Sequence, residues 1–163
     1  MLPPVTPYRV EPLGKSHDRE GFSCGSPPLD RYLRQQARQD AEKRVAAPFV
    51  LIEPPASQVL GYYTLSASVV DASELPNTLA RKLPRYPQLP VTLLGRLALD
   101  QGMKGRGAGE FLLMNALRRS LAREGLPILM PFPGPALDGT GPAPEAELLE
   151  ILRRSIGYRL RLR

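Results

Sequence analysis

The sequence contains only one cysteine, Cys24, and only one histidine, His17. A lone cysteine excludes an internal disulfide, and this pair is too small a set for a zinc site of cysteine and histidine ligands. A hydrolytic triad would have to use His17, and the polar stretch around it favours an ordinary surface position. We therefore expect no metal, and we expect chemistry from the backbone, carboxylates, tyrosines or a bound cofactor.

Long apolar runs are also missing. Although 42% of the residues are hydrophobic, no run approaches the roughly 18 residues that cross a bilayer. Pro3, Pro4 and Pro7 interrupt the N-terminal stretch, so we expect no secretory signal, no membrane partner and a cytoplasmic location. The length of 163 residues fits a single domain, and the formal charge of +6 makes it basic.

Apolar residues spaced by four predict a helix over residues 27–43. Leu29, Leu33 and Ala37 lie on its apolar stripe, and the hydroxyl of Ser26 is expected to cap its first turn. The opposite face is basic and carries Arg31, Arg34, Arg38, Lys43 and Arg44. This face either binds phosphates or only keeps the protein soluble.

Three runs predict strands, at residues 48–53, 58–66 and 91–99. The first two are separated by a short turn, which indicates an antiparallel hairpin. Alternation along the second strand places one of Tyr62 and Tyr63 in the core and the other outward.

The third strand leads into a glycine-rich loop, residues 101–109, and then into a predicted helix over residues 110–124. The first amides of a helix have no partner within it, and Lys104 and Arg106 add positive charge, which makes the loop a candidate pyrophosphate cradle. The alternative is that its glycines only permit a sharp turn. The loop lacks the P-loop pattern and the third glycine of the dinucleotide fingerprint, which argues against phosphoryl and hydride transfer.

Prolines and glycines are dense over residues 126–144, where the sequence predicts only a short strand at 128–130. Residues 143–156 predict a last helix, and residues 158–163 alternate as a strand does. We expect one domain over residues 1–163, with this Pro/Gly-rich segment and a divergent C-terminal helix and strand at 145–163.

Several motifs resemble those of GNAT-fold N-acetyltransferases. Residues 104–109, Lys-Gly-Arg-Gly-Ala-Gly, resemble the [RQK]-x-x-G-x-[GA] loop that grips the pyrophosphate of acetyl-CoA. Phe-Ser-Cys-Gly at 22–25, followed by Leu29, Asp30, Leu33 and Ala37, resembles the F-x-C-G…L-D-x-x-L…A entry helix of the toxin branch of this superfamily. Its later motifs resemble residues 61–66, 83–87 and 94–100.

This resemblance implies an α/β (α+β) GNAT fold, with a central, mixed and mostly antiparallel sheet flanked by helices and a divergent C-terminal part. It implies acetyl-CoA as the cosubstrate. The backbone of the strand end would pair with the pantetheine arm, at Leu97, Ala98 and Leu99. The loop would hold the diphosphate, at Lys104, Gly105, Arg106, Gly107, Ala108 and Gly109.

In the toxin branch the acceptor is the α-amine of an aminoacyl-tRNA, and a ribbon-helix-helix antitoxin neutralises the enzyme. The resemblance therefore implies a tRNA acceptor and such an antitoxin as partners, while a homodimer is left open. The basic residues Arg81, Lys82, Arg85 and Arg96 are the candidates for holding the acceptor stem.

The C-terminus departs from the family pattern. The family's last helix ends in F-Y-x-x-x-G-F, whose tyrosine serves as the general acid, and the alignment of Gly157 and Tyr158 with its G-F puts Arg153 at that tyrosine. Tyr158 is then the nearest phenol and the only candidate catalytic side chain, and activity is expected to be reduced. Two alternatives remain: acetylation of a small amine or a protein, or an impaired module that binds CoA or an antitoxin.

Overall fold

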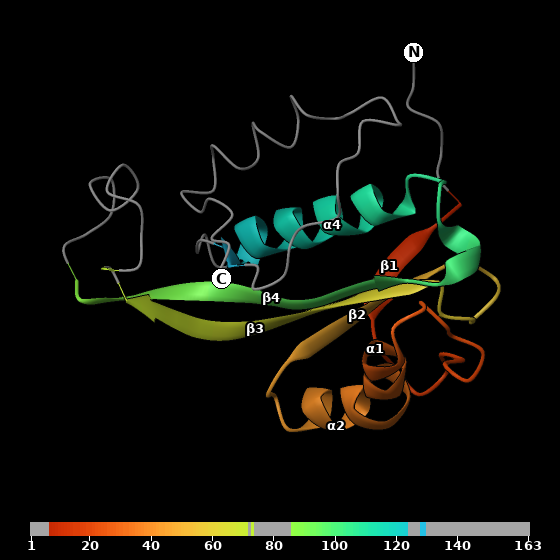
Figure 1. The fold of residues 1–163 in the computed structure, drawn as a ribbon, viewed down its shortest axis with the longest axis horizontal. Helices are drawn as coiled ribbons and strands as arrows, with labels where there is room; N and C mark the ends of the chain where they lie inside the picture. The colour runs from red at the N-terminus through yellow and green to blue at the C-terminus, as the bar shows by residue number, and fades with distance from the viewer. Residues whose placement is uncertain (1–6, 72, 74–85, 124–127, 130–163) are drawn as a thin grey trace, which may run out of the picture. The chain divides into compact units, whose positions relative to one another are not determined.

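The computed structural model describes residues 7–71, 73, 86–123 and 128–129, which Figure 1 shows in colour. The chain divides into two compact units. The first unit comprises Met1–Thr64 and Arg96–Leu112, and the second comprises Leu65–Gly95 and Leu113–Arg163. The predicted helix over 143–156 and the strand over 158–163 lie outside the described residues.

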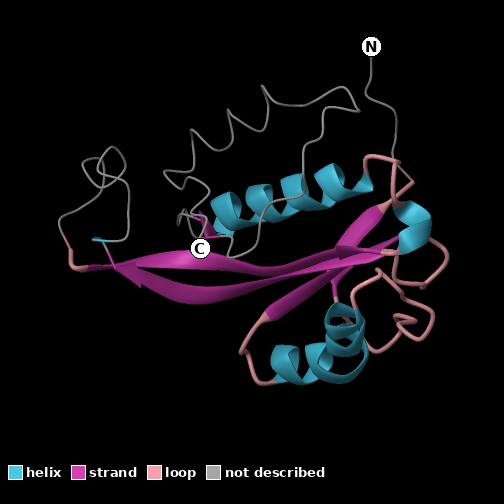
Figure 2. Cartoon of the chain, in the orientation of Figure 1, coloured by secondary structure: helices cyan, strands magenta, loops and turns pink. Residues whose placement is uncertain are grey.

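A five-stranded sheet has the order β1-β2-β3-β4-β5. In the first unit β1 (Arg9–Pro12) pairs antiparallel with β2 (Ala47–Ile52). The neighbour of β2 is β3 (Gly61–Asp71), followed by β4 (Gln88–Leu99), and β4 pairs in parallel with β5 (Ile128–Leu129) in the second unit. Figure 2 shows this mixture of strands and helices, and the predicted mixed, mostly antiparallel α/β fold is confirmed.

The predicted helix over residues 27–43 forms as three continuous pieces. It begins with α1 (Pro27–Arg31), widens into the π-helical turn η1 (Tyr32–Gln36) and ends with α2 (Ala37–Glu42). A four-residue spacing drifts about 40° per step around an ordinary α-helix, and a wider π turn offsets this drift. Consequently Leu33 and Ala37 are both fully buried.

Ser26 is the N-cap residue, as predicted, but its hydroxyl makes no capping hydrogen bond. The buried carboxylate of Asp30 instead accepts a hydrogen bond of 2.9 Å from the amide of Cys24. The start of this helix is therefore held by a side chain inside the helix that reaches back to the preceding segment.

Tyr62 and Tyr63 point to opposite faces of β3, and both are fully buried, so the prediction that one faces outward is wrong. The hydroxyl of Tyr62 donates to the carbonyl oxygen of Leu29 on α1, 2.8 Å away. The ring of Tyr63 stacks on Phe49, with ring centres 5.2 Å apart. Both faces of the sheet are covered in this unit, which alternation along one strand cannot reveal.

Past β4 the chain forms the short 3-10 helix η3 (Gln101–Met103), a turn, and then α4 (Ala108–Arg123). The helix predicted over 110–124 is thus confirmed, and it begins two residues earlier, at Ala108. Among the helices in the described ranges, none combines the length and apolar character that a membrane crossing requires.

Candidate coenzyme-binding site

The loop between β4 and α4 depends on glycine for its backbone path. Gly105 has φ +78° and Gly107 has φ +74°, the left-handed region that side chains disfavour. A Cβ atom added at either residue would meet, apart from its chain neighbours, no atom of the described residues within 4 Å. These positions therefore need glycine for backbone conformation rather than for lack of space, and the loop surface beside them is open.

The first turn of α4 faces this loop. The amide of Phe111 donates to the carbonyl oxygen of Gly107 at 3.1 Å, so the amides of Ala108, Gly109 and Glu110 precede this hydrogen bond of the helix. Such amides carry the positive end of the helix dipole and bind anions. Lys104 and Arg106, both exposed, add two cations to the same short loop.

The end of β4 lies directly before the loop and packs tightly. A Cβ atom on Gly109 would come within 3.3 Å of the Leu99 side chain, and one on Gly61 would come within 3.1 Å of the Ala98 carbonyl oxygen. Ala98 belongs to the buried core of this unit, while Leu97 and Leu99 are partly exposed. Glycine at position 109 thus allows the helix start to approach the strand end closely, and glycine at position 61 allows β3 to do so. The predicted coenzyme residues 97–99 and 104–109 lie in one unit.

Asp100, which the sequence analysis did not single out, holds the start of the loop. Its Oδ1 accepts a hydrogen bond from the amide of Gly102, and its Oδ2 accepts one from the amide of Ser23, both at 3.0 Å. An aspartate at a strand end before a helical turn is a recognisable capping signal. Its partner Ser23 is 77 residues away in the sequence, and no local pattern identifies such a contact.

Arg96, predicted to help hold the acceptor stem, lies over an aromatic ring. Its guanidinium carbon is 3.6 Å from the centre of the Tyr32 ring, a cation–π arrangement. The Tyr32 hydroxyl donates to Asp40 Oδ2 at 2.8 Å, and its ring stacks on Tyr62 with centres 6.2 Å apart. No sequence pattern predicted this cluster, which joins the π turn, α2, β3 and β4.

Burial and hydrogen bonding shift several pKa values in this cluster. Burial raises the pKa of both the Tyr32 and Tyr62 phenols, which therefore stay protonated. The side-chain amide of Gln36 donates to Asp40 Oδ1 at 2.9 Å and is the main cause that lowers the Asp40 pKa, with Tyr32 and Arg96 acting in the same direction. Burial, followed by the nearby Asp30, raises the pKa of the Cys24 thiol.

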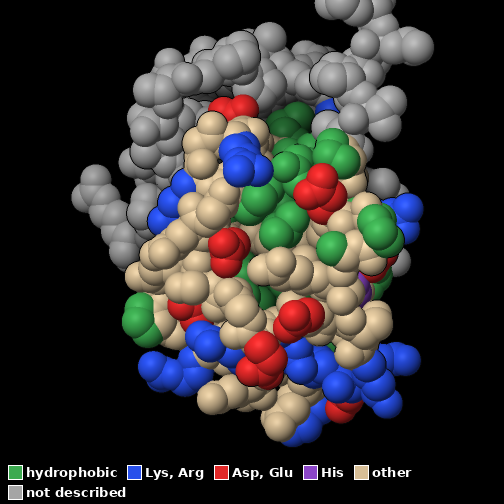
Figure 3. All heavy atoms as spheres, turned by 90° about the vertical axis from the view of Figure 1, so that its right-hand side faces the viewer, with side chains coloured by type: hydrophobic (Ala, Val, Ile, Leu, Met, Phe, Trp, Pro, Cys, Tyr) green, Lys and Arg blue, Asp and Glu red, His purple; other side chains and the backbone are tan. Residues whose placement is uncertain are grey.

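The predicted basic face of the N-terminal helix is mostly exposed. Figure 3 shows Lys and Arg side chains gathered on the part of the surface that carries α1 and α2, with a few acidic groups among them. Arg31, Arg34, Lys43 and Arg44 are exposed, whereas Arg38 pairs with Glu42 at 3.0 Å. Most of this positive charge therefore faces solvent.

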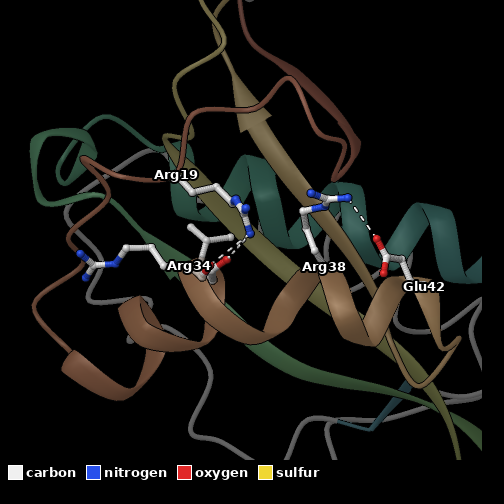
Figure 4. Close-up of polar contacts among 5 residues, drawn as sticks. Arg19, Arg34, Arg38 and Glu42 are labelled. Carbon is white, nitrogen blue, oxygen red and sulfur yellow. Dashed lines mark hydrogen bonds and ion pairs between the residues drawn. The ribbon is translucent and has the colours of Figure 1, made fainter.

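Arg19 has a different role from these surface arginines. Its guanidinium donates to the carbonyl oxygens of Leu33 and Arg34, at 3.1 and 3.4 Å, as Figure 4 shows. These carbonyls belong to the π turn, where the ordinary helical pairing is interrupted. Arg19 therefore supports the π turn. The first residue of this turn is Tyr32, whose ring makes the cation–π contact with Arg96.

The remaining candidates have varied outcomes. The surface position expected for His17 is wrong: it is buried, its Nδ1 accepts from the Gly14 amide at 2.8 Å, and its Nε2 donates to Glu11 at 2.6 Å. The described ranges contain no group of His, Cys, Asp and Glu suited to a metal ion. Other predicted residues lie outside the described residues, namely Arg81, Lys82, Arg85, Arg153 and Tyr158.

No known family model matches the chain. Among curated proteins, it is 35% identical over 107 residues to a tRNA-acetylating toxin of Mycobacterium tuberculosis, covering 66% of this chain and 62% of that protein. It is 27% identical over 111 residues to the probable toxin TacT of Sinorhizobium fredii, covering 68% of this chain and 61% of that protein. The chain thus spans about 61–62% of the length of these curated relatives.

Solved structures agree with these matches. A point mutant of KacT superposes with a TM-score of 0.70 and 26% identity, covering 88% of this chain and 85% of KacT. A mutant of the toxin AtaT, bound to the C-terminus of the antitoxin AtaR and to acetyl-CoA, superposes with a TM-score of 0.58 and 26% identity, covering 72% of this chain and 68% of AtaT.

The fold and the loop together define the class of protein: the chain has the GNAT fold. Within that class it is similar in sequence to proteins named as toxins, as its motifs indicated.

Proposed function

We propose that the protein is an acetyl-CoA-dependent N-acetyltransferase that acetylates the α-amine of an aminoacyl-tRNA. One observation carries this proposal. Left-handed glycines at 105 and 107 place the first amides of α4 and the cations of Lys104 and Arg106 around one open loop at the end of β4. This is the arrangement that a coenzyme diphosphate requires.

The proposed reaction requires few catalytic side chains. The acceptor amine, after losing a proton, forms a bond to the acetyl carbonyl carbon, the carbon–sulfur bond breaks, and the thiolate takes up a proton. Leu97, Ala98 and Leu99 would align the pantetheine arm through their backbone, and their amides would polarise the carbonyl oxygen. Tyr158 is the proposed proton donor toward sulfur, in place of the tyrosine that Arg153 replaces.

The acceptor is supported by a relative named as a tRNA-acetylating toxin and by the exposed basic helix face. Arg96 is the described member of the proposed tRNA-binding set, together with Arg81, Lys82 and Arg85. The contact with the Tyr32 ring restrains its guanidinium, and guanidinium N–H groups bind phosphate oxygens well.

We propose a ribbon-helix-helix antitoxin as the protein partner, and a cytoplasmic location, where both substrates are made. Support for an antitoxin comes from the AtaT neighbour, which is bound to the C-terminus of AtaR. A second copy of the chain is a further proposed partner, for which oligomeric state in solution is the test.

Arg153 supports a second candidate, a module that binds CoA or the antitoxin with little turnover. Loss of a general acid costs roughly 10²- to 10⁴-fold in rate. Acetylation of a small amine or a protein is the remaining alternative, because the same fold serves many acceptors.

The test is to incubate the full chain with acetyl-CoA and charged tRNA, follow the free thiol of CoA and analyse the tRNA for acetylated aminoacyl ends. Thiol release with acetylated aminoacyl-tRNA is the expected result. Release only with other amines would contradict the tRNA acceptor, and CoA binding without any release would favour the module.

A further inference from the structure

Asp100 connects the coenzyme loop to a segment far away in the sequence. We propose that Asp100 is a positioning residue, which holds the loop in the shape that receives the diphosphate by tying it to residues 22–25. This inference rests on the proposed function, because the site that Asp100 would hold in shape is the proposed binding site for the coenzyme diphosphate.

The contacts of Asp100 form a clamp between the two segments. Its carboxylate accepts from the amides of Ser23 and Gly102, each at 3.0 Å. The amide of Gln101 donates back to the carbonyl oxygen of Ser23 at 2.9 Å. Because one carboxylate serves both segments, removing either oxygen as an acceptor weakens the support of the loop.

The Phe-Ser-Cys-Gly motif therefore has two sides. Phe22 and Cys24 are buried in the core, whereas the alternate residues Ser23 and Gly25 are exposed and face the loop. Gly25 has φ +91°, and a Cβ atom there would lie 3.0 Å from the Gln101 side-chain nitrogen and 3.8 Å from Lys104 Nζ. The buried residues of the motif thus anchor it in the core, and its exposed residues support the loop.

A loop that is ordered before binding loses less conformational entropy when the ligand arrives. The clamp should therefore strengthen binding of CoA, which carries the diphosphate, and leave binding of pantetheine, which lacks it, unchanged. A purely structural role would affect both ligands alike.

The experiment compares Asp100→Asn with Asp18→Asn in the full chain. Asp18 is the matched control, since its carboxylate also accepts a hydrogen bond of 3.0 Å from a backbone amide, that of Glu20, but at an exposed position outside the loop. CoA is titrated by calorimetry, and pantetheine is titrated by ligand-observed NMR. We expect Asp100→Asn to weaken CoA about tenfold, from the loss of a charge-assisted hydrogen bond, with pantetheine unchanged and the control like wild type.

Hydrogen exchange of amides 101–110 in the free protein gives an independent measurement, with faster exchange expected only in Asp100→Asn. If that variant does not fold, Gly25→Ala tests the same support from the other side. Unchanged CoA affinity, or equal weakening of both ligands, would overturn the positioning role while the proposed function stands. A wild-type chain that does not bind CoA would overturn the proposed function, and exchange would still report whether the clamp orders the loop.

Discussion

The guanidinium carbon of Arg96 lies over the ring of Tyr32, 3.6 Å from its centre. Tyr32 opens the π turn of the N-terminal helix, and Arg96 is near the end of β4, two residues before Ala98. The contact thus links the basic helix to the strand that is proposed to hold the coenzyme arm. The contact holds the positive charge of Arg96 in place beside the end of β4, whereas the side chain of a solvated arginine would move freely.

Replacing Arg96 with alanine is expected to weaken tRNA binding and to reduce the slope of log affinity against log salt by about one, because one phosphate contact is lost. Arg38→Ala is the control, since Arg38 already pairs with Glu42. Filter binding over a salt series measures both. An unchanged slope for Arg96→Ala would remove this residue from the tRNA interface.

Gly105→Ala and Gly107→Ala are expected to weaken CoA binding. Each places a side chain at positive φ, which costs about 1–2 kcal/mol, although there is space for the methyl group. Calorimetry with CoA and thermal melting measure the effects, with Gly14→Ala as the control because a Cβ there meets only ordinary contacts with His17. Full CoA affinity in both loop variants would show that the loop backbone does not cradle the ligand.

Acidification is expected to remove a stabilising contribution from Asp40. Hydrogen bonds from Gln36 and Tyr32 lower its pKa below the ordinary 3.8, so the folded state favours the carboxylate. The contribution is complete above the unfolded pKa and disappears as the pH falls through the lower, folded value. Urea unfolding between neutral and acid pH should show a steeper loss of stability in wild type than in Asp40→Asn, and parallel curves would contradict this.

Cys24 is expected to react slowly with thiol reagents in the folded protein. Burial raises the pKa of its thiol, so little of the reactive thiolate forms near neutral pH. Timed labelling with a disulfide reagent, with and without denaturant, should show fast modification only after unfolding. Fast labelling of the native chain would mean that the segment 22–25 opens readily.

Much of the fold follows from local patterns. Four-residue spacing predicted the N-terminal helix, and the succession of strand, glycines and leucines predicted β4, the loop and α4. The π turn escaped prediction because spacing alone does not distinguish it from an α-helix with a drifting stripe. The buried position of His17 was missed because a polar stretch predicts exposure, whereas the ring nitrogens of His17 pair with two groups of that same stretch, the Gly14 amide and the Glu11 carboxylate.

In the candidate site, too, local sequence predicted some features and the tertiary contacts could not be predicted. Its glycines and cations stand next to one another in the sequence, and the motif placed them on one loop. The contacts of Arg96 with Tyr32 and of Asp100 with Ser23 join residues that only the folded sheet brings together. No periodicity within one element carries information about such pairs.

Calorimetric titration of the wild-type chain with acetyl-CoA tests the central claim most directly, because every step of the proposed function requires the loop to hold the coenzyme diphosphate. We predict saturable binding of one acetyl-CoA per chain, which inorganic pyrophosphate competes away. The absence of any saturable heat, or binding that pyrophosphate leaves untouched, would contradict the account.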